Sequence, residues 1–467
     1  MYRSRWILFT VVFIIILSSI PLIFQEAEAG EPIFRTNSLV NWEEDLRTFN
    51  QIPLDIVSNQ DGRIYVSFHS GMSWMPMNPY VSYSDDCGAT WSRAFRIDDV
   101  LKDGNETNDE TAQSNPRLAV APNGTLYAVW QDNRDHTHTQ QIRIAWSKDG
   151  ENFSRSVRID PPKLYPTYDA KNPSIEISEE GRIVVAWQDK NESGSYWNIY
   201  SSYSDDGGIT WSDMVRINTD SMHHRQHEYC RMAMNGDDVY VAWHDNRDDG
   251  QYRPYLAASH DGGETYGPEV ALSDDLELYN SRQWPSPAVD DAGNLYVSWR
   301  DKRSGFDEIW FTRSTDGGET FSDNSRVVTV PEGSEDWYPS TAARGDGIVS
   351  VAFQRRVPTK ESKDEGEIFY INSTDGGRTW DRMMRVDDTD TLWSDITAQR
   401  NPVLAYDNSG RALVAWADER YGDRNNYYAD VWFSRHSGDL SGPNHDPVLY
   451  DLEFAGNFSF NPDLGSA

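Results

Sequence analysis

Short runs of strand length, either alternating or continuously apolar, recur along the chain from about residue 50 onward. The stretch 172–218 is representative, because turn residues separate its runs NPSIEIS, RIVVAWQD, WNIYSSYS and MVRIN. Alternation with a period of two is typical of half-buried strands, and short apolar runs between turns are typical of fully buried ones. No window after the first thirty residues has the period of an amphipathic helix. The pattern predicts an all-β protein.

This unit of four runs occurs seven times. The seven copies span 51–100, 115–160, 172–218, 229–274, 284–330, 338–388 and 401–440. Four short strands repeated at intervals of 55 to 62 residues are typical of β-propellers. The sequence therefore predicts a seven-bladed β-propeller of four-stranded antiparallel blades.

A turn of the form S-x-D-x-G-x-T-aromatic follows the third run of most units, as in SYSDDGGITW at 202–211. Its copies end at Trp91, Phe153, Trp211, Tyr266, Phe321 and Trp380. Because this turn occurs six times, six blades remain the alternative. An aspartate in such a turn accepts hydrogen bonds from nearby backbone N–H groups. A catalytic group is needed once, so its repetition favours a structural role for this aspartate.

The seventh unit lacks a fourth run, and the missing strand has a counterpart near the start of the chain. PIFRTN at 32–37 is similar to AFRID (94–98), SVRID (156–160) and MVRIN (214–218). We expect 32–37 to close the ring as the outer strand of the last blade, with LYDLEFAG (449–456) as the alternative. The predicted organisation is a propeller over 30–445 and a C-terminal tail over 446–467.

The first 29 residues have the pattern of a signal peptide. Arg3 and Arg5 precede an apolar run at 7–24, and Ala27 and Ala29 form an A-x-A end. An uncleaved membrane anchor is the alternative. We therefore expect a secreted or cell-surface protein with no stable membrane span after cleavage. The net charge of −33 argues against nucleic acid and anionic membranes as partners.

The repeated turn resembles the Asp box of the sialidase-type (BNR-repeat) β-propellers, and the resemblance covers essentially the whole chain after residue 30. It implies a propeller whose Asp boxes are structural. It specifies activity less closely, because sialidases, xyloglucan-cleaving hydrolases, assembly factors and receptors share these turns. The FRIP-like motif of sialidases would correspond to IFRT (33–36), which lacks the proline.

A second motif, W-x-D-x-R, ends the second run of several units. WHDNRD (243–248) contains Asp245 and Arg247, and WRDKRS (299–304) contains Arg303. The sixth unit has FQRR instead, which adds Arg355. These residues lie on the face opposite the repeated turns, so they either form a substrate-binding rim or make structural ion pairs around the ring. Arginine suits carboxylate ligands because its planar fork binds them through two hydrogen bonds.

The repeat fails at the start of two inner strands. Arg117 and Arg231 stand where NPS, WPS and YPS place a serine, so we expect two cationic groups near the channel axis. Just before Arg231, the segment 221–230 gathers three histidines with Glu228 and Tyr229. The family resemblance implies arginines for a substrate carboxylate, an acid/base carboxylate and a tyrosine nucleophile activated by a glutamate. A metal site and an ordinary polar loop are the alternatives for this cluster.

Two functions remain open at this stage. One is an exo-acting, sialidase-like glycoside hydrolase for acidic glycans, with Glu228, Tyr229 and Asp245 as catalytic groups. Its substrate-binding arginines would be Arg117, Arg231, Arg247, Arg303 and Arg355. The other is a non-catalytic propeller that binds glycans or cell-surface glycoproteins. Neither requires a cofactor or a metal, and the hydrolase requires Arg117, Arg231 and Arg247 to share one pocket.

Overall fold

In the residues that the structure, a computed structural model, describes, the chain forms only strands and loops. The described residues are 34–42, 50–71, 77–99, 112–134, 140–160, 169–190, 196–219, 226–247, 250–274, 281–345, 347–356, 366–388, 398–420 and 428–437. Within them, seven four-stranded antiparallel sheets lie in one compact unit, 33–444. The prediction of a seven-bladed, four-stranded propeller is confirmed.

Each sheet is one blade, numbered here from the first complete one. Blade 1 comprises β2 (Asn50–Ser58), β3 (Ile64–Gly71), β4 (Asn78–Ser84) and β5 (Phe95–Arg96); blade 2 comprises β6 (Gln113–Val120), β7 (Leu126–Asp132), β8 (Gln141–Ser147) and β9 (Val157–Arg158). Blade 3 comprises β10 (Ala170–Ile177), β11 (Ile183–Lys190), β12 (Trp197–Ser204) and β13 (Val215–Arg216); blade 4 comprises β14 (His227–Asn235), β15 (Asp238–Asp245), β16 (Arg253–Ser259) and β17 (Val270–Ala271). Blade 5 comprises β18 (Arg282–Val289), β19 (Leu295–Asp301), β20 (Glu308–Ser314) and β21 (Ser325–Arg326); blade 6 comprises β22 (Glu335–Arg344), β23 (Ile348–Arg356), β24 (Gly366–Ser373) and β25 (Met384–Arg385). Blade 7 comprises β26 (Gln399–Tyr406), β27 (Ala412–Asp418), β28 (Asp430–Arg435) and β1 (Ser38–Leu39).

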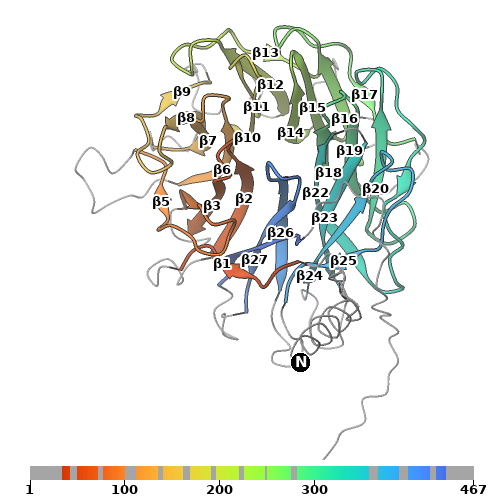
Figure 1. The fold of residues 1–467 in the computed structure, drawn as a ribbon. Helices are drawn as coiled ribbons and strands as arrows, with labels where there is room; N and C mark the ends of the chain where they lie inside the picture. The colour runs from red at the N-terminus through yellow and green to blue at the C-terminus, as the bar shows by residue number, and fades with distance from the viewer. Residues whose placement is uncertain are drawn as a thin grey trace, which may run out of the picture. The chain divides into compact units, whose positions relative to one another are not determined.

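The seven blades form a closed ring with the first strand of each at the centre (Figure 1). Inner strands pack against one another in the order β2, β6, β10, β14, β18, β22 and β26, and β26 returns to β2. Each blade runs outward as consecutive antiparallel strands. The unpaired edge of each inner strand faces the enclosed channel, which protects it from pairing with another chain.

Blade 7 takes its outer strand from the N-terminal side of the chain. β1 pairs with β28, so that Ser38 faces Phe433. Whereas 32–37 was the expected segment, the paired strand begins at residue 38, and Phe34 makes only an isolated bridge with His436. Burial explains the position, because Val40 is fully buried and its N–H donates to the Val431 carbonyl at 2.9 Å. The alternative segment 449–456, the predicted tail and the predicted signal peptide lie outside the described residues.

The core lies between adjacent blades. The second strands are buried on both faces, which explains why their sequences are continuously apolar rather than alternating. Their central aromatic side chains are fully buried: Phe68, Trp130, Trp187, Trp243, Trp299, Phe353 and Trp416. The described part of the chain contains no helix long and apolar enough to cross a membrane.

The repeated turns are held by local hydrogen bonds, as blade 3 illustrates. Asp206 accepts from the Thr210 N–H (2.8 Å) and the Thr210 hydroxyl (2.5 Å), and the Gly208 N–H donates to Ser204 Oγ at 2.9 Å. The Thr210 hydroxyl holds the pKa of Asp206 at about 2. Gly207 and Gly208 have φ of 75° and 88°, which favours glycine. The aspartate is therefore occupied within the turn.

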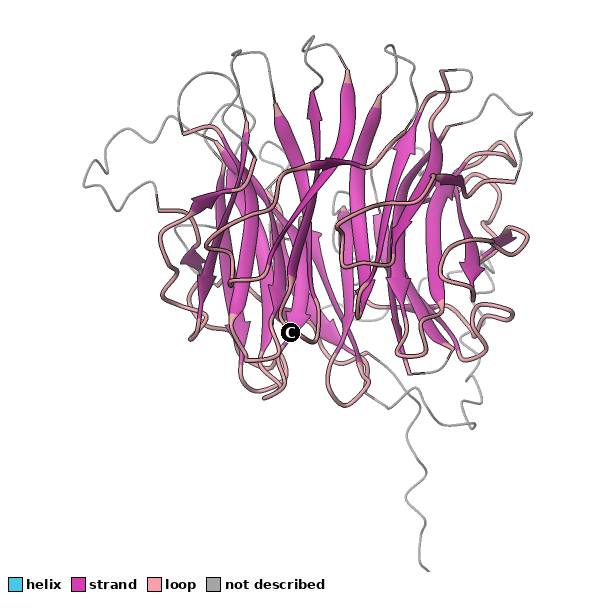
Figure 2. Cartoon of the chain, turned by 90° about the horizontal axis from the view of Figure 1, so that it is seen from above, coloured by secondary structure: helices cyan, strands magenta, loops and turns pink. Residues whose placement is uncertain are grey.

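The strands run between two faces of the ring (Figure 2). One face carries the repeated turns and the turns between first and second strands. The opposite face, called the mouth face below, carries the ends of the second strands and the starts of the inner strands. Any pocket formed by the starts of the inner strands opens on the mouth face.

Candidate functional site

Every inner strand carries a bulge near the mouth face. In blades 2 to 7 one residue at the bulge is left-handed, with φ between 51° and 56°: Asn115, Asn172, Tyr229, Trp284, Tyr338 and Asn401. A bulge bends its strand and re-aims the side chains that follow. The residue two positions further on lines the central channel, and its counterpart in blade 1 is Asp55. We call these the ring residues: Asp55, Arg117, Ser174, Arg231, Ser286, Ser340 and Val403.

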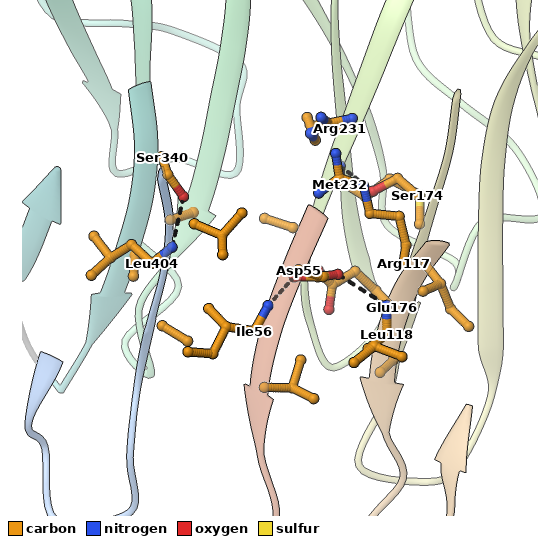
Figure 3. Close-up of a pocket in the computed structure, with 18 of the residues that line it drawn as sticks. Asp55, Ile56, Arg117, Leu118, Ser174, Glu176, Arg231, Met232, Ser340 and Leu404 are labelled. Carbon is orange, nitrogen blue, oxygen red and sulfur yellow. Dashed lines mark hydrogen bonds between the residues drawn. The ribbon is translucent and has the colours of Figure 1, made fainter. Parts of the chain in front are cut away.

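Four ring residues fasten one inner strand to the next. The hydrogen bonds run from Leu118 N–H to Asp55 Oδ2 (3.0 Å), Met232 N–H to Ser174 Oγ (3.1 Å), Thr341 N–H to Ser286 Oγ (2.9 Å) and Leu404 N–H to Ser340 Oγ (3.0 Å). Each N–H donor belongs to the residue that follows the ring residue of a neighbouring blade. For Arg231 the residue at this donor position is Pro287 in blade 5, which has no N–H. An arginine in place of serine at 231 therefore removes no hydrogen bond from the ring. Figure 3 shows three of these four hydrogen bonds around the channel.

Ser340→Ala should lower the free energy of unfolding by about 1 kcal/mol, because it leaves the buried Leu404 N–H without its acceptor. Urea denaturation measures the change. Ser304→Ala, at an exposed loop position, is the control and should stay within about 0.5 kcal/mol of the parent protein. Equal effects of the two substitutions would contradict this role for Ser340.

Arg117 and Arg231 share the channel. They line both a mouth cavity of about 300 Å³ and a deeper cavity of about 460 Å³. Arg117 donates to the Leu54 carbonyl and Arg231 to the Cys230 carbonyl (3.2 Å), and within the described chain neither makes an ion pair with a carboxylate. Burial, and then the charge of Arg231, lower the pKa of Arg117 to about 9. The two guanidiniums thus leave positive charge facing an open cavity.

Two carboxyl groups lie deeper in the same channel. Asp55 accepts N–H bonds from Ile56 and Leu118, both at 3.0 Å (Figure 3). Burial, and then the charge of Asp55, raise the pKa of Glu176 to about 8, so Glu176 is mostly protonated at neutral pH. At the mouth, burial and the nearby Arg117 lower the pKa of His69 to about 4, which keeps this imidazole neutral. Burial also raises the pKa of Asp55, although the charge of Arg117 opposes this shift. The channel therefore combines two guanidiniums with two buried carboxyl groups whose pKa values are both raised.

Glu228 and Tyr229 are neighbours that face different partners. Tyr229 lines the mouth cavity and its ring lies 5.2 Å from that of His244. Glu228 accepts a hydrogen bond from the Tyr252 hydroxyl at 2.9 Å. No hydrogen bond joins Glu228 to Tyr229 among the described residues. The glutamate therefore pairs with Tyr252, which lines neither channel cavity, and not with Tyr229 as the sequence suggested.

Asp245, Arg247, Arg303 and Arg355 lie outside the channel and already have carboxylate or guanidinium partners. Arg247 pairs with Asp245 (2.5 Å) and with Glu269, and its guanidinium stacks on Tyr255. Arg303 pairs in the same way with Asp301 (2.7 Å) and Asp274 (2.6 Å), and the buried Arg355 pairs with Asp336 (2.7 Å). Arg247 does not join Arg117 and Arg231, so the expected three-arginine pocket is not formed. Arg247 and Arg303, from the W-x-D-x-R motif, instead form ion pairs that link the ends of second strands to segments near the outer strands.

Arg247→Ala should lower the free energy of unfolding by about 2 kcal/mol, because it leaves the buried Asp245 and Glu269 without their main cation. Thermal and urea denaturation measure this loss. Arg93→Ala, an exposed arginine near the end of a repeated turn, is the matched control and should have little effect. A stability equal to that of the control variant would show that the ion pair is not structural.

Three channel residues were not predicted from the sequence: Asp55, Glu176 and His69. Glu176 occupies a position that is apolar in every other inner strand: Val57, Ala119, Ala233, Ala288, Ala342 and Ala405. Aligning the inner strands would have revealed it. Among the described residues, no three His, Cys, Asp or Glu side chains are grouped as metal ligands. His223 and His224, from the segment considered as a metal site, lie outside those residues.

The seven-bladed ring and its polar channel define a β-propeller of the sialidase type. Residues 80–351, more than half of the chain, match the family described as the BNR repeat-like domain, and the protein belongs to that family. No curated protein sequence matches the chain.

Several solved structures share the fold at low sequence identity. A protein of unknown function from Dyadobacter fermentans is 14% identical with a TM-score of 0.50, over 87% of this chain and 99% of its own. A Trypanosoma rangeli sialidase, solved with the inhibitor DANA, is 15% identical with a TM-score of 0.48, over 88% of this chain and 60% of its own. A Penicillium chrysogenum α-L-arabinanase, solved with arabinobiose, is 15% identical with a TM-score of 0.46, over 68% and 92%. At these identities the likeness concerns the fold alone.

Proposed function

We propose that the protein binds a carboxylate-bearing sugar in the mouth of its central channel. The observation that carries this proposal is the pair of channel-facing guanidiniums, Arg117 and Arg231, which have no carboxylate partner in the described structure. A planar guanidinium donates two parallel hydrogen bonds to a carboxylate, and the pairing strengthens where water is excluded. A ligand carboxylate would give these two guanidiniums the partner that no carboxylate of the described channel supplies.

The size of the mouth favours recognition of a chain end. A cavity of about 300 Å³ holds one sugar ring with its substituents rather than an extended polymer. Beyond Arg117 and Arg231 the channel continues to Glu176, whose protonated carboxyl can donate a hydrogen bond to a sugar hydroxyl. Terminal acidic sugars of glycans, including those on cell-surface glycoproteins, fit this description.

Hydrolysis of the same sugar is a second candidate, favoured by one observation. Glu176 keeps its proton at neutral pH and so has the protonation state of a general acid, with the carboxyl of Asp55 in the same channel. Two carboxyl groups in different environments are the usual machinery of glycoside hydrolysis. This candidate differs from the mechanism expected from the sequence, which relied on Glu228, Tyr229 and Asp245.

The proposed site of action is outside the cytoplasm. The signal-peptide pattern at 1–29 supports export of the propeller, with secretion or retention at the cell surface as its destination. Glycans with terminal acidic sugars are accessible there. Detection of the processed protein in the culture medium or on intact cells tests this assignment, and a wholly cytoplasmic protein would contradict it.

Calorimetric titration tests the proposed function. The probes are N-acetylneuraminic acid with its methyl ester, and glucuronic acid with glucose, so that each acid has a neutral counterpart. At least one acid should bind more than tenfold tighter than its counterpart. Failure of both acids to bind would overturn the proposal. Nitrophenyl glycosides of the same acids report hydrolysis, and turnover that is lost in Glu176→Gln would favour the second candidate.

A further inference from the structure

We propose that aromatic side chains on one side of the mouth form a second subsite, which binds the face of a neutral sugar ring. The residues are Tyr229 of β14, Trp284 of β18, and Trp337 and Tyr338 of β22; we call them the aromatic arc. The inference rests on the proposed function and deepens it. The ligand would be an acidic sugar joined to a neutral hexose, with one ring in each subsite.

Three members of the arc, Trp284, Trp337 and Tyr338, form a continuous aromatic surface, and Tyr229 lines the same cavity. The ring of Trp284 lies 4.5 Å from that of Tyr338 and 5.7 Å from that of Trp337. Trp337 and Tyr338 are 5.8 Å apart. Tyr229, Trp284 and Tyr338 line the mouth cavity together with Arg231, and Tyr229 is 42% exposed. The arc thus begins beside the guanidinium that would hold the carboxylate.

The mouth has two chemically different sides. The left-handed bulge residues are aromatic in blades 4, 5 and 6 but asparagine in blades 2, 3 and 7. On the amide side, Asn115 Nδ2 donates to Asn172 Oδ1 at 2.7 Å, and Asn172 Nδ2 donates to Gln188 Oε1 at 2.8 Å. These amides bond to each other and to glutamines, whereas the arc presents partly exposed rings. The seven blades repeat one fold, so this asymmetry is a property of the side chains and not of the architecture.

The left-handed backbone conformation of the aromatic bulge residues costs conformational energy. Asparagine adopts a left-handed backbone readily, whereas tryptophan and tyrosine do so rarely. Trp284 and Tyr338 nevertheless have φ of 56° and 52°. Such strain is concentrated at binding and catalytic sites, where the surrounding structure maintains it. Asparagine would satisfy the backbone at these positions, so the rings serve another purpose.

Two arginines lie against the tryptophan rings of the arc. The guanidinium of the buried Arg300 lies 4.6 Å from the ring of Trp284 and 4.4 Å from that of Trp337, and it pairs with Asp307 at 3.0 Å. Arg356 lies 4.9 Å from the ring of Trp337. Aromatic clusters also bind cationic ligands, but Arg300 and Arg356 already lie against the rings of Trp284 and Trp337, and Arg231 lines the same cavity. A sugar ring is neutral and offers the C–H face that stacks on an aromatic surface.

The test compares one acid sugar with the same sugar joined to a neutral disaccharide or hexose. The probes are N-acetylneuraminic acid against sialyllactose, and glucuronic acid against a glucuronyl-glucose disaccharide. Calorimetry should give at least tenfold tighter binding of the larger ligand in one pair. Trp284→Asn should abolish this gain and leave the affinity for the monosaccharide within about twofold. Asparagine is the residue of the equivalent position in three blades, so this variant keeps the backbone conformation.

Two variants separate the subsite from the acid site. Asn401→Ala, on the amide side of the mouth, should leave the gain intact, whereas Arg231→Ser should weaken both members of the pair. Equal losses for both ligands in Trp284→Asn, or no gain in the parent protein, would overturn the subsite while the proposed function stands. Binding of lactose that depends on Trp284, with no binding of either acid, would instead overturn the proposed function and keep the aromatic subsite.

Discussion

Arg231→Ser is expected to weaken the binding of the carboxylate-bearing sugar by about a hundredfold or more. The guanidinium of Arg231 would make two charge-assisted hydrogen bonds to the ligand, each contributing about 1.5–3 kcal/mol. Serine is the residue of the equivalent position in three blades, and Pro287 opposite it has no N–H to bond. The fold should therefore accept the substitution. Calorimetry with the tightest-binding acid measures the loss.

Two comparisons make this result specific. Arg231→Lys retains the charge but loses the planar fork, so its affinity should lie between those of the parent protein and Arg231→Ser. Arg247→Ala removes an arginine from the same face outside the channel, and its affinity at a temperature where it is folded should match the parent's. Loss of binding in Arg247→Ala without unfolding would contradict the placement of the acid site in the channel.

Glu176→Gln is expected to raise the free energy of unfolding by about 5 kcal/mol at pH 9 and by less than about 1 kcal/mol at pH 5. The ordinary pKa of a glutamate is 4.5, and burial raises that of Glu176 to about 8. Between these two values the unfolded chain releases a proton that the folded protein keeps. The stability of the parent protein therefore falls as the pH rises from 4.5 to 8, and glutamine, which carries no such proton, avoids this loss.

Urea denaturation at a series of pH values measures the effect. Glu179→Gln is the matched control, because Glu179 is exposed in the turn directly after the strand that carries Glu176. The control should show the same pH profile as the parent protein. A stabilisation by Glu176→Gln that is the same at pH 5 and pH 9 would mean that Glu176 does not hold a proton in the folded channel.

The fold could be predicted from the sequence because each blade repeats the same local pattern. The alternation of the inner strands, the buried second strands and the turn around Asp206 are all determined within one unit. Closure was harder to place, since Ser38 and Leu39 pair with a strand almost 400 residues away. Their short paired segment carries little pattern of its own, and the resemblance of 32–37 to other outer strands indicated only the right region.

The candidate site was only partly visible in the sequence. Arg117 and Arg231 stood out because they interrupt the serine of the inner-strand motif. Arg247 is unavailable to a ligand because it pairs with Glu269, which lies near the outer strand of the same blade. The sequence pattern does not predict that these two residues meet. Asp55 escaped because the first inner strand has its bulge at Pro53 and lacks the N-P-S motif. The closed ring of seven blades determines which side chains share the channel. This arrangement depends on contacts between residues far apart in the sequence.

The closure of blade 7 also constrains the order in which the chain can fold. Its outer strand is made early in synthesis, but the partner strand β28 emerges only after nearly four hundred further residues. Until then six blades can form by local pairing while Ser38 and Leu39 have no partner. At a synthesis rate of about 5–20 residues per second, this interval lasts tens of seconds. During it the apolar faces of the two end blades of the incomplete ring are exposed to other chains. Factors that cover apolar surface should therefore affect the yield of this protein more than its final stability.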